Sequence, residues 1–170
     1  AEPHIVGSEH SCSLQDLEEE LKADGIAALL LVSSRLTKGD AIDFPAAIAL
    51  AHRYSVPAIL DAAAQDFRVK KLIETDADLI LISAQKYMAA PTTGLIVGKS
   101  AYVSAAKAQE AGIGRAMKAS KEALMGTIAA LEERLSLDLP AWKAEQSEKA
   151  HHFIETANEI TGVTAWTEPD

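Results

Sequence analysis

The sequence predicts an α/β fold in which helices flank a mainly parallel sheet. Three apolar runs of strand length, at 27–32, 56–60 and 79–82, alternate with segments of helical character. Continuous apolar runs are typical of strands covered on both faces of a parallel sheet, and this order produces successive right-handed crossovers. A fourth run, 94–98, follows too closely for a helical crossover, so we expect it to be antiparallel or at an edge.

Helix start signals precede several of the remaining segments. Ser13 and Asp16 fit a capping-box pattern, and Asp43 with Pro45 in the next turn marks a second helix start. Residues 162–166 are predicted to form a further strand. Helices are expected over 13–24, 43–54, 69–74, 100–111 and 120–135 and after the Leu139-Pro140 break.

Composition disfavours several classes of function. The chain has 170 residues with 48% hydrophobic content, enough for one compact domain. Its net charge of −9 disfavours nucleic-acid binding, which requires clustered cations. Cys12, the single cysteine, predicts a reducing, cytoplasmic setting, and no apolar run is long enough for a membrane span. His151 and His152 point in different directions on a helix, so no metal site is expected.

Polar side chains follow all three parallel strands of the predicted sheet. They are Ser33-Ser34-Arg35, then Asp61, then Ser83 with Lys86. Ligands of open α/β sheets bind at the carboxyl ends of the strands, so these residues form the candidate site.

Asp61 and Lys86 suggest the kind of ligand. Asp61 has apolar neighbours on both sides, and a carboxylate in such a setting requires a cationic or hydrogen-bonding partner. A lysine that loses its water among apolar residues is available as a neutral nucleophile. Pyridoxal 5'-phosphate meets both conditions, because its ring nitrogen pairs with a carboxylate and its aldehyde condenses with an amine.

Four ordered motifs resemble a known family. They are Asp61-Ala62-Ala63-Ala64-Gln65, Ser83-Ala84-Gln85-Lys86, Pro91-Thr92-Thr93-Gly94-Leu95-Ile96-Val97-Gly98-Lys99 and Gly112-Ile113-Gly114-Arg115-Ala116-Met117-Lys118. Together they resemble the fold-type I pyridoxal-phosphate enzymes related to bacterial selenocysteine synthase, in the branch of the D-glucosaminate-6-phosphate ammonia-lyases. The resemblance implies the large domain of an aspartate aminotransferase-like fold, truncated here.

The resemblance implies specific roles for these residues. Lys86 would form the Schiff base, Asp61 would pair with the pyridinium nitrogen, and Ser83 would bind the cofactor phosphate. Gln65, at the end of the first motif, is a further candidate for cofactor contact, with no contact as the alternative. The chain departs from the family at Ala84-Gln85, where relatives often have glycines.

Other side chains are candidates for binding the substrate. Arg115 and Lys118 lie before a helix start, where an anion is favoured, so they are expected to bind substrate or the cofactor of a neighbouring subunit. Ser34 and Arg35 are further candidates at a strand end.

The resemblance also implies a domain arrangement. Residues 1–138 would belong to the cofactor-binding domain, and 139–170 would provide a linking helix and the start of a small domain. The family's cofactor-phosphate loop, its ring-stacking residue and most of the small domain would lie outside this chain. A homodimer or a larger even homo-oligomer is expected.

The leading functional hypothesis is a lyase. It would eliminate ammonia or another β-leaving group from an amino acid or amino-sugar acid phosphate through a Lys86 aldimine. One alternative is selenium transfer on seryl-tRNA, which the acidic charge disfavours. The other is a catalytically incomplete fragment or assembly module, which would bind no cofactor and expose an apolar face.

Overall fold

A parallel sheet with one antiparallel strand organises the fold. The computed structural model describes residues 2–8, 11–34, 42–64 and 69–167. Within them the strands are β1 (Leu29–Ser34), β2 (Ala58–Ala64), β3 (Leu79–Ser83) and β4 (Gly94–Gly98), in the order β1-β2-β3-β4. The first three are parallel and β4 is antiparallel to β3, so the predicted α/β class and the predicted direction of β4 are confirmed.

The two faces of this sheet differ in exposure. Register partners form rows across all four strands, and side chains alternate between faces along each strand. In the row Leu31, Leu60, Ile80 and Val97 the side chains face the core. The next row is Val32, Asp61, Leu81 and Ile96, and the face that carries it is called the open face below. On that face Val32 is 56% exposed and Ile96 48% exposed.

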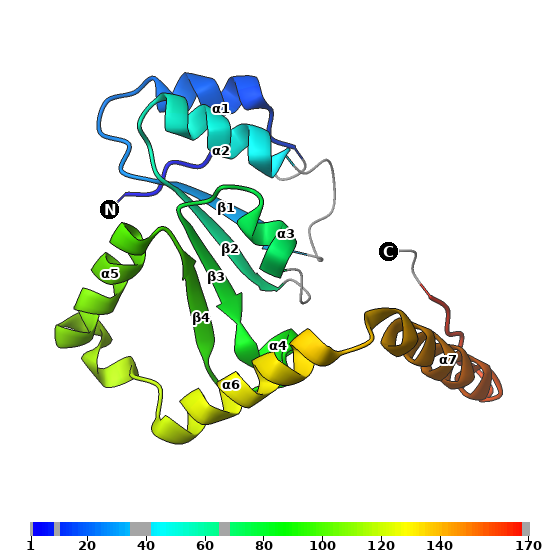
Figure 1. Ribbon diagram of the computed structural model, residues 1–170. Helices are drawn as coiled ribbons and strands as arrows, with labels where there is room; N and C mark the ends of the chain where they lie inside the picture. The colour runs from blue at the N-terminus through cyan, green and yellow to red at the C-terminus, as the bar shows by residue number, and fades with distance from the viewer. Residues whose placement is uncertain (1, 9–10, 35–41, 65–68, 168–170) are drawn as a thin grey trace. The chain divides into compact units, whose positions relative to one another are not determined.

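Helices cover the other face of the sheet (Figure 1). Four helices, α1 (Leu14–Leu21), α2 (Phe44–Arg53), α3 (Val69–Ile73) and α6 (Lys121–Ser136), contribute buried side chains to the core cluster of the strands. Helix α1 packs against α2. The predicted caps are confirmed: Ser13 and Asp16 form a capping box, and Asp43 Oδ1 accepts the Ala46 N–H at 2.7 Å.

Among the remaining helices, only the one-turn helix α4 (Ala84–Tyr87) contains a buried residue, Ala84, within the described ranges. Helix α4 follows β3, and α5 (Ser100–Ala108) follows β4. The 3₁₀ turns η1 (Gln109–Ala111) and η2 (Ile113–Met117) come next, and α7 (Leu139–Asn158) is the last helix. None of α5, η1, η2 and α7 contains a buried residue.

The chain forms two compact units, residues 1–131 and 132–170. The division into a cofactor-binding domain (1–138) and the start of a small domain (139–170) stays a prediction. Within the described ranges, no helix is long and apolar enough to cross a membrane.

Two sequence expectations are wrong in detail. Asp61 does not follow β2 but lies inside it, because the strand continues to Ala64. Residues 162–166 form no strand. The side chain of Asn158 instead bonds the backbone there, since its Oδ1 accepts the Ala165 N–H at 2.8 Å and its Nδ2 donates to Ala165 O at 3.1 Å.

Candidate active site

Lys86 lies in the one-turn helix that directly follows β3. Ala84 and Met88 are 0% and 1% exposed, and residues at this spacing share one side of a helical turn. Lys86, midway between them, points away from that side, and its side chain is exposed. From the sequence, Lys86 is expected among apolar residues that remove its water. In the structure, the buried side chains of Ala84 and Met88 instead anchor the turn, and the side chain of Lys86 is exposed.

Asp61 and Ser83 project from the same face of the sheet. Asp61 is the register partner of Leu81, and Ser83 lies two residues further along β3. Because side chains alternate along a strand, Leu81 and Ser83 share the open face with Asp61. Both Asp61 and Ser83 are half-buried. The structure therefore brings these two predicted site residues together on neighbouring strands, with Lys86 one turn beyond Ser83.

Asp61 and Ser83 retain capacity for further hydrogen bonds. Asp61 Oδ1 accepts the Ala63 N–H at 2.9 Å. Ser83 occupies the N-cap position of α4, but its hydroxyl makes no capping bond. A carboxylate offers about four acceptor sites, and a hydroxyl offers one donor and two acceptors. A carboxylate, a hydroxyl and a primary amine are thus accessible together, and this donor set suits a ligand with a ring nitrogen, a phosphate and an aldehyde.

One other predicted residue, Ser34, belongs to a described strand beside this site. Ser34 ends β1 and pairs with Ala64 of β2 after a register shift, which places its backbone at the carboxyl end of the neighbouring strand. Arg35 and Gln65 lie outside the described residues.

Arg115 and Lys118 line a separate hollow of about 480 Å³ along α5, η1 and η2. Lys107 adds a third cation to it, and Glu110 adds a carboxylate. Lys118 Nζ lies 3.8 Å from Glu110 Oε2, a long separation between two exposed groups. The structure thus places both predicted residues, Arg115 and Lys118, in one hollow. In Figure 1 the segment from α5 to η2 stands beyond β4, away from β1 and β2.

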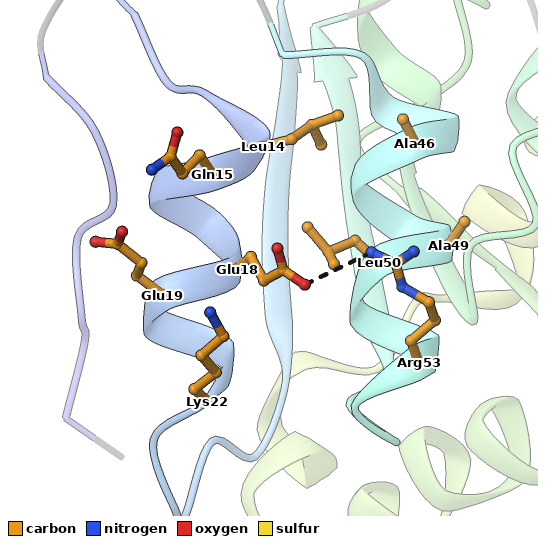
Figure 2. A pocket seen from close by; sticks show the side chains of 9 residues that line it. All are labelled: Leu14, Gln15, Glu18, Glu19, Lys22, Ala46, Ala49, Leu50 and Arg53. Carbon is orange, nitrogen blue, oxygen red and sulfur yellow. Dashed lines mark ion pairs between the residues drawn. The ribbon is translucent and has the colours of Figure 1, made fainter.

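A larger open hollow, of about 790 Å³, lies between α1 and α2 (Figure 2). Its polar lining comes mostly from α1, with Glu18 paired to Arg53 of α2 at 3.8 Å. Tyr54 donates to Glu18 Oε1 at 3.0 Å. None of the predicted site residues lines this hollow. Glu18 is already bound by Arg53 and Tyr54, and we assign the hollow no ligand.

Sequence reasoning missed one ionic cluster, centred on Asp78 at the amino end of β3. Asp78 is 4% exposed. It accepts hydrogen bonds from the Ala58 N–H at 2.7 Å and from His52 Nε2 and Lys99 Nζ, each at 2.8 Å. Burial by itself raises the pKa of Asp78, but the bonds from Lys99, Ala58 and His52 outweigh it, and the pKa lies below its usual value. No local pattern signals the cluster, because its partners come from separate elements.

The chain is similar to known proteins over most of its length. The model of the beta-eliminating lyase family matches residues 6–167. A 5'-C-glycyluridine monooxygenase-decarboxylase of Streptomyces sp is 34% identical over 148 residues, which cover 85% of this chain and 36% of that protein. A D-glucosaminate-6-phosphate ammonia lyase of Salmonella typhimurium is 32% identical over 127 residues, covering 75% of this chain and 34% of that protein.

Solved structures agree with these matches. The structure of a D-glucosaminate-6-phosphate ammonia-lyase superposes with a TM-score of 0.76 at 32% identity, covering 97% of this chain and 43% of that chain. A serine palmitoyltransferase solved as its pyridoxal-phosphate internal aldimine has a TM-score of 0.55 at 14% identity, covering 72% of this chain and 34% of that chain, which shows the fold alone.

The fold and the matched structures define the class as the large domain of the fold-type I enzymes, as the sequence predicted. Within that class, the chain belongs to the beta-eliminating lyase family. It spans about a third of the length of the two curated relatives.

Proposed function

We propose that this chain supplies part of the active site of a lyase that uses pyridoxal 5'-phosphate. Its substrate would be an amino acid or amino-sugar acid phosphate that loses ammonia or another β-leaving group. One observation carries the proposal: Asp61 and Ser83 share a face of neighbouring strands, and β3 leads from Ser83 directly into the turn of Lys86. Family membership and the ammonia-lyase relatives support the same chemistry.

Each of the three residues would have a distinct task. Lys86 would hold the cofactor through Nζ and, once released, would take the proton from the substrate Cα. Asp61 would keep the ring nitrogen protonated, since an adjacent carboxylate favours the charged form. Ser83 would donate a hydrogen bond from its hydroxyl group to a phosphate oxygen. When bound, the cofactor supplies an electron sink for the pair left at Cα.

Further binding roles follow the same proposal. Gln65 would contact the cofactor, and Ser34 and Arg35 would contact the substrate. Arg115 and Lys118 would bind a phosphate or carboxylate of the substrate, or the cofactor of a neighbouring subunit, because their hollow carries more cations than carboxylates. The whole protein would act in the cytoplasm as a homodimer or larger even homo-oligomer.

Borohydride reduction tests the central part of the proposal. The protein is incubated with excess pyridoxal 5'-phosphate, reduced and digested, and its peptides are analysed by mass spectrometry. We expect a phosphopyridoxyl group on Lys86. The adduct should vanish in Lys86→Ala and persist in Lys71→Ala, which removes another exposed lysine. Labelling that is equal in both variants, or absent from the parent protein, would overturn the proposal.

One observation favours a second candidate. The Streptomyces relative, a monooxygenase-decarboxylase, is 34% identical and covers more of this chain than the ammonia lyase does. Such a reaction breaks the bond from Cα to the carboxyl group and consumes O₂. Ammonia release from D-glucosaminate 6-phosphate without O₂ uptake supports the lyase, whereas O₂ uptake with CO₂ release from a glycyl nucleoside supports this second reaction.

A further inference from the structure

Two backbone hydrogen bonds, both made by Ala84, join the ends of the segment that carries Lys86. The Ala84 N–H donates to Thr93 O at 3.0 Å, and the Ala90 N–H donates to Ala84 O at 3.1 Å. Ala84 and Met88 are also fixed by burial, at 0% and 1% exposure. Residues 84–93 therefore form a closed loop, called the Lys86 loop below, whose two ends meet at the start of the turn that holds Lys86.

Helix α6 bonds the outer part of this loop. Thr93 Oγ1 and Thr127 Oγ1 are 2.6 Å apart, and the Thr127 hydroxyl also lies 2.8 Å from Ala123 O. Thr93 Oγ1 also lies 3.0 Å from Pro91 O, within the Lys86 loop. Each hydroxyl has one proton, so the Thr93–Thr127 bond is donated by Thr93 when Thr127 donates to Ala123 O, and by Thr127 when Thr93 donates to Pro91 O. Thr127 is 6% exposed, and an apolar replacement would leave the Thr93 hydroxyl without this partner.

Gly126, the preceding residue of α6, contacts the same loop closely. A Cβ at this position would lie 2.6 and 2.7 Å from Pro91 Cγ and Cδ, well inside van der Waals contact. Glycine is disfavoured in helix interiors because it gains the most freedom on unfolding. Its presence here is explained by the close approach of the Pro91 ring.

We propose that Gly126 and Thr127 are positioning residues that set the placement of Lys86 through Pro91 and Thr93. Their effect on cofactor binding rests on the proposed function. Their effect on the Lys86 loop does not rest on it, because their contacts with Thr93 and Pro91 require no bound cofactor. Neither residue touches a reacting atom in this proposal.

The test compares four variants of the full chain. Thr127→Val removes the hydroxyl at nearly constant volume, and Thr127→Ser retains it. Gly126→Ala adds the Cβ that meets Pro91. Ala129→Gly is the matched control, since it weakens α6 at an exposed position. Amide hydrogen exchange over 84–93 is measured without cofactor, and pyridoxal 5'-phosphate affinity is measured by absorbance titration.

We expect Thr127→Val to speed exchange in the Lys86 loop and to raise the Kd of the cofactor by about three- to tenfold, the range of one lost hydrogen bond. Thr127→Ser and Ala129→Gly should stay within about twofold of the parent protein. Gly126→Ala should have at least the effect of Thr127→Val. If Gly126→Ala does not fold, the comparison of Thr127→Val with Thr127→Ser still tests the positioning role.

The outcomes separate the two proposals. Exchange and Kd unchanged in Thr127→Val, or changed equally in Ala129→Gly, overturn the positioning role. If the parent protein forms no adduct at Lys86 but Thr127→Val still loosens the Lys86 loop, the proposed function fails and the positioning role of α6 stands. If neither the adduct nor the loosening is found, both fail.

Discussion

At the scale of single residues, Asp78 and Lys86 mark opposite ends of β3. Asp78 precedes the strand and is buried among donors, whereas Lys86 follows it and is exposed. The carboxylate links the start of β2 to the end of β4, because it accepts from the Ala58 N–H and from Lys99 Nζ. A buried ion pair that loses one partner leaves an uncompensated charge. The amino end of the sheet therefore depends on Asp78 remaining ionised.

This dependence gives a prediction for pH and stability. The pKa of Asp78 is lowered in the folded chain, so its contribution is complete above the ordinary aspartate pKa of about 4 and is lost as pH falls through the lowered value. Asp78→Asn should cost about 1–3 kcal/mol at neutral pH, because His52 and Lys99 lose a charged acceptor but remain partly exposed to water.

Urea unfolding between neutral pH and about pH 3 measures this loss. The difference in unfolding free energy between parent and Asp78→Asn should shrink toward acid. Asp24→Asn, at an exposed position, is the control. A difference that does not change with pH would contradict the role given to the Asp78 charge.

A second prediction at this scale concerns Asp61. If its carboxylate keeps the cofactor nitrogen protonated, Asp61→Asn should lower turnover of D-glucosaminate 6-phosphate by about a hundredfold or more, as loss of a catalytic charge partner commonly does. The borohydride adduct on Lys86 should persist, because the amine is unchanged. Ammonia release and peptide mass spectrometry measure the two quantities. Turnover equal to that of the parent would exclude Asp61 from this role.

At the scale of secondary-structure elements, a glycine allows β3 and β4 to pair. Gly98 ends β4 with φ +150°, and a Cβ there would lie 2.1 Å from Asp78 O. Lys99 N–H donates to that same carbonyl at 2.9 Å. The turn from β4 to α5 therefore passes so close to the start of β3 that no side chain fits at residue 98.

We expect Gly98→Ala to destabilise the chain by at least about 2 kcal/mol, since backbone strain and a clash with the neighbouring strand add together. Gly25→Ala is a matched control: φ is +89° there, but nothing lies within 4 Å of the added Cβ. That control should cost only about 1 kcal/mol, from backbone strain alone. Equal losses in urea unfolding would show that contact with Asp78 contributes nothing.

Local patterns predicted most of these elements. The caps at Ser13 and Asp43 and the strand at 94–98 depend on neighbours in sequence, and the structure has all three. The strand predicted at 162–166 fails because a strand requires a partner, and Asn158 satisfies that backbone instead. The Asp78 cluster was not predictable, because His52 and Lys99 approach it only after β2, β3 and β4 have paired.

The positions of the candidate site residues were predictable in part. Sequence spacing places Asp61, Ser83 and Lys86 at one edge of a parallel sheet, and the structure brings Asp61 and Ser83 to one face. Spacing does not reveal the exposure of Lys86, since that depends on the burial of Ala84 and Met88 around it. It also does not reveal the contact of α6 with the Lys86 loop, which joins residues far apart in the chain.

At the scale of the whole molecule, the sheet is covered unequally. Parallel strands normally have both faces covered, but here the core side chains of α2 and α3 pack on one face, and Val32 and Ile96 remain exposed on the open face. Asp61 and Ser83 project from this same face. The polar groups of the candidate site thus emerge from an apolar surface.

The last prediction tests this surface in solution. Contiguous apolar surface binds environment-sensitive dyes, so the protein should enhance the fluorescence of such a dye. The double variant Val32→Ser with Ile96→Ser should roughly halve that signal, because it removes two of the exposed apolar side chains of the open face. Ile113→Ser is the control, since Ile113 is 83% exposed but belongs to η2 and not to the sheet. A signal that falls equally in the control, or not at all in the double variant, would mean that the open face is covered in solution. Light scattering on the same samples would then show whether copies of the chain cover it by self-association.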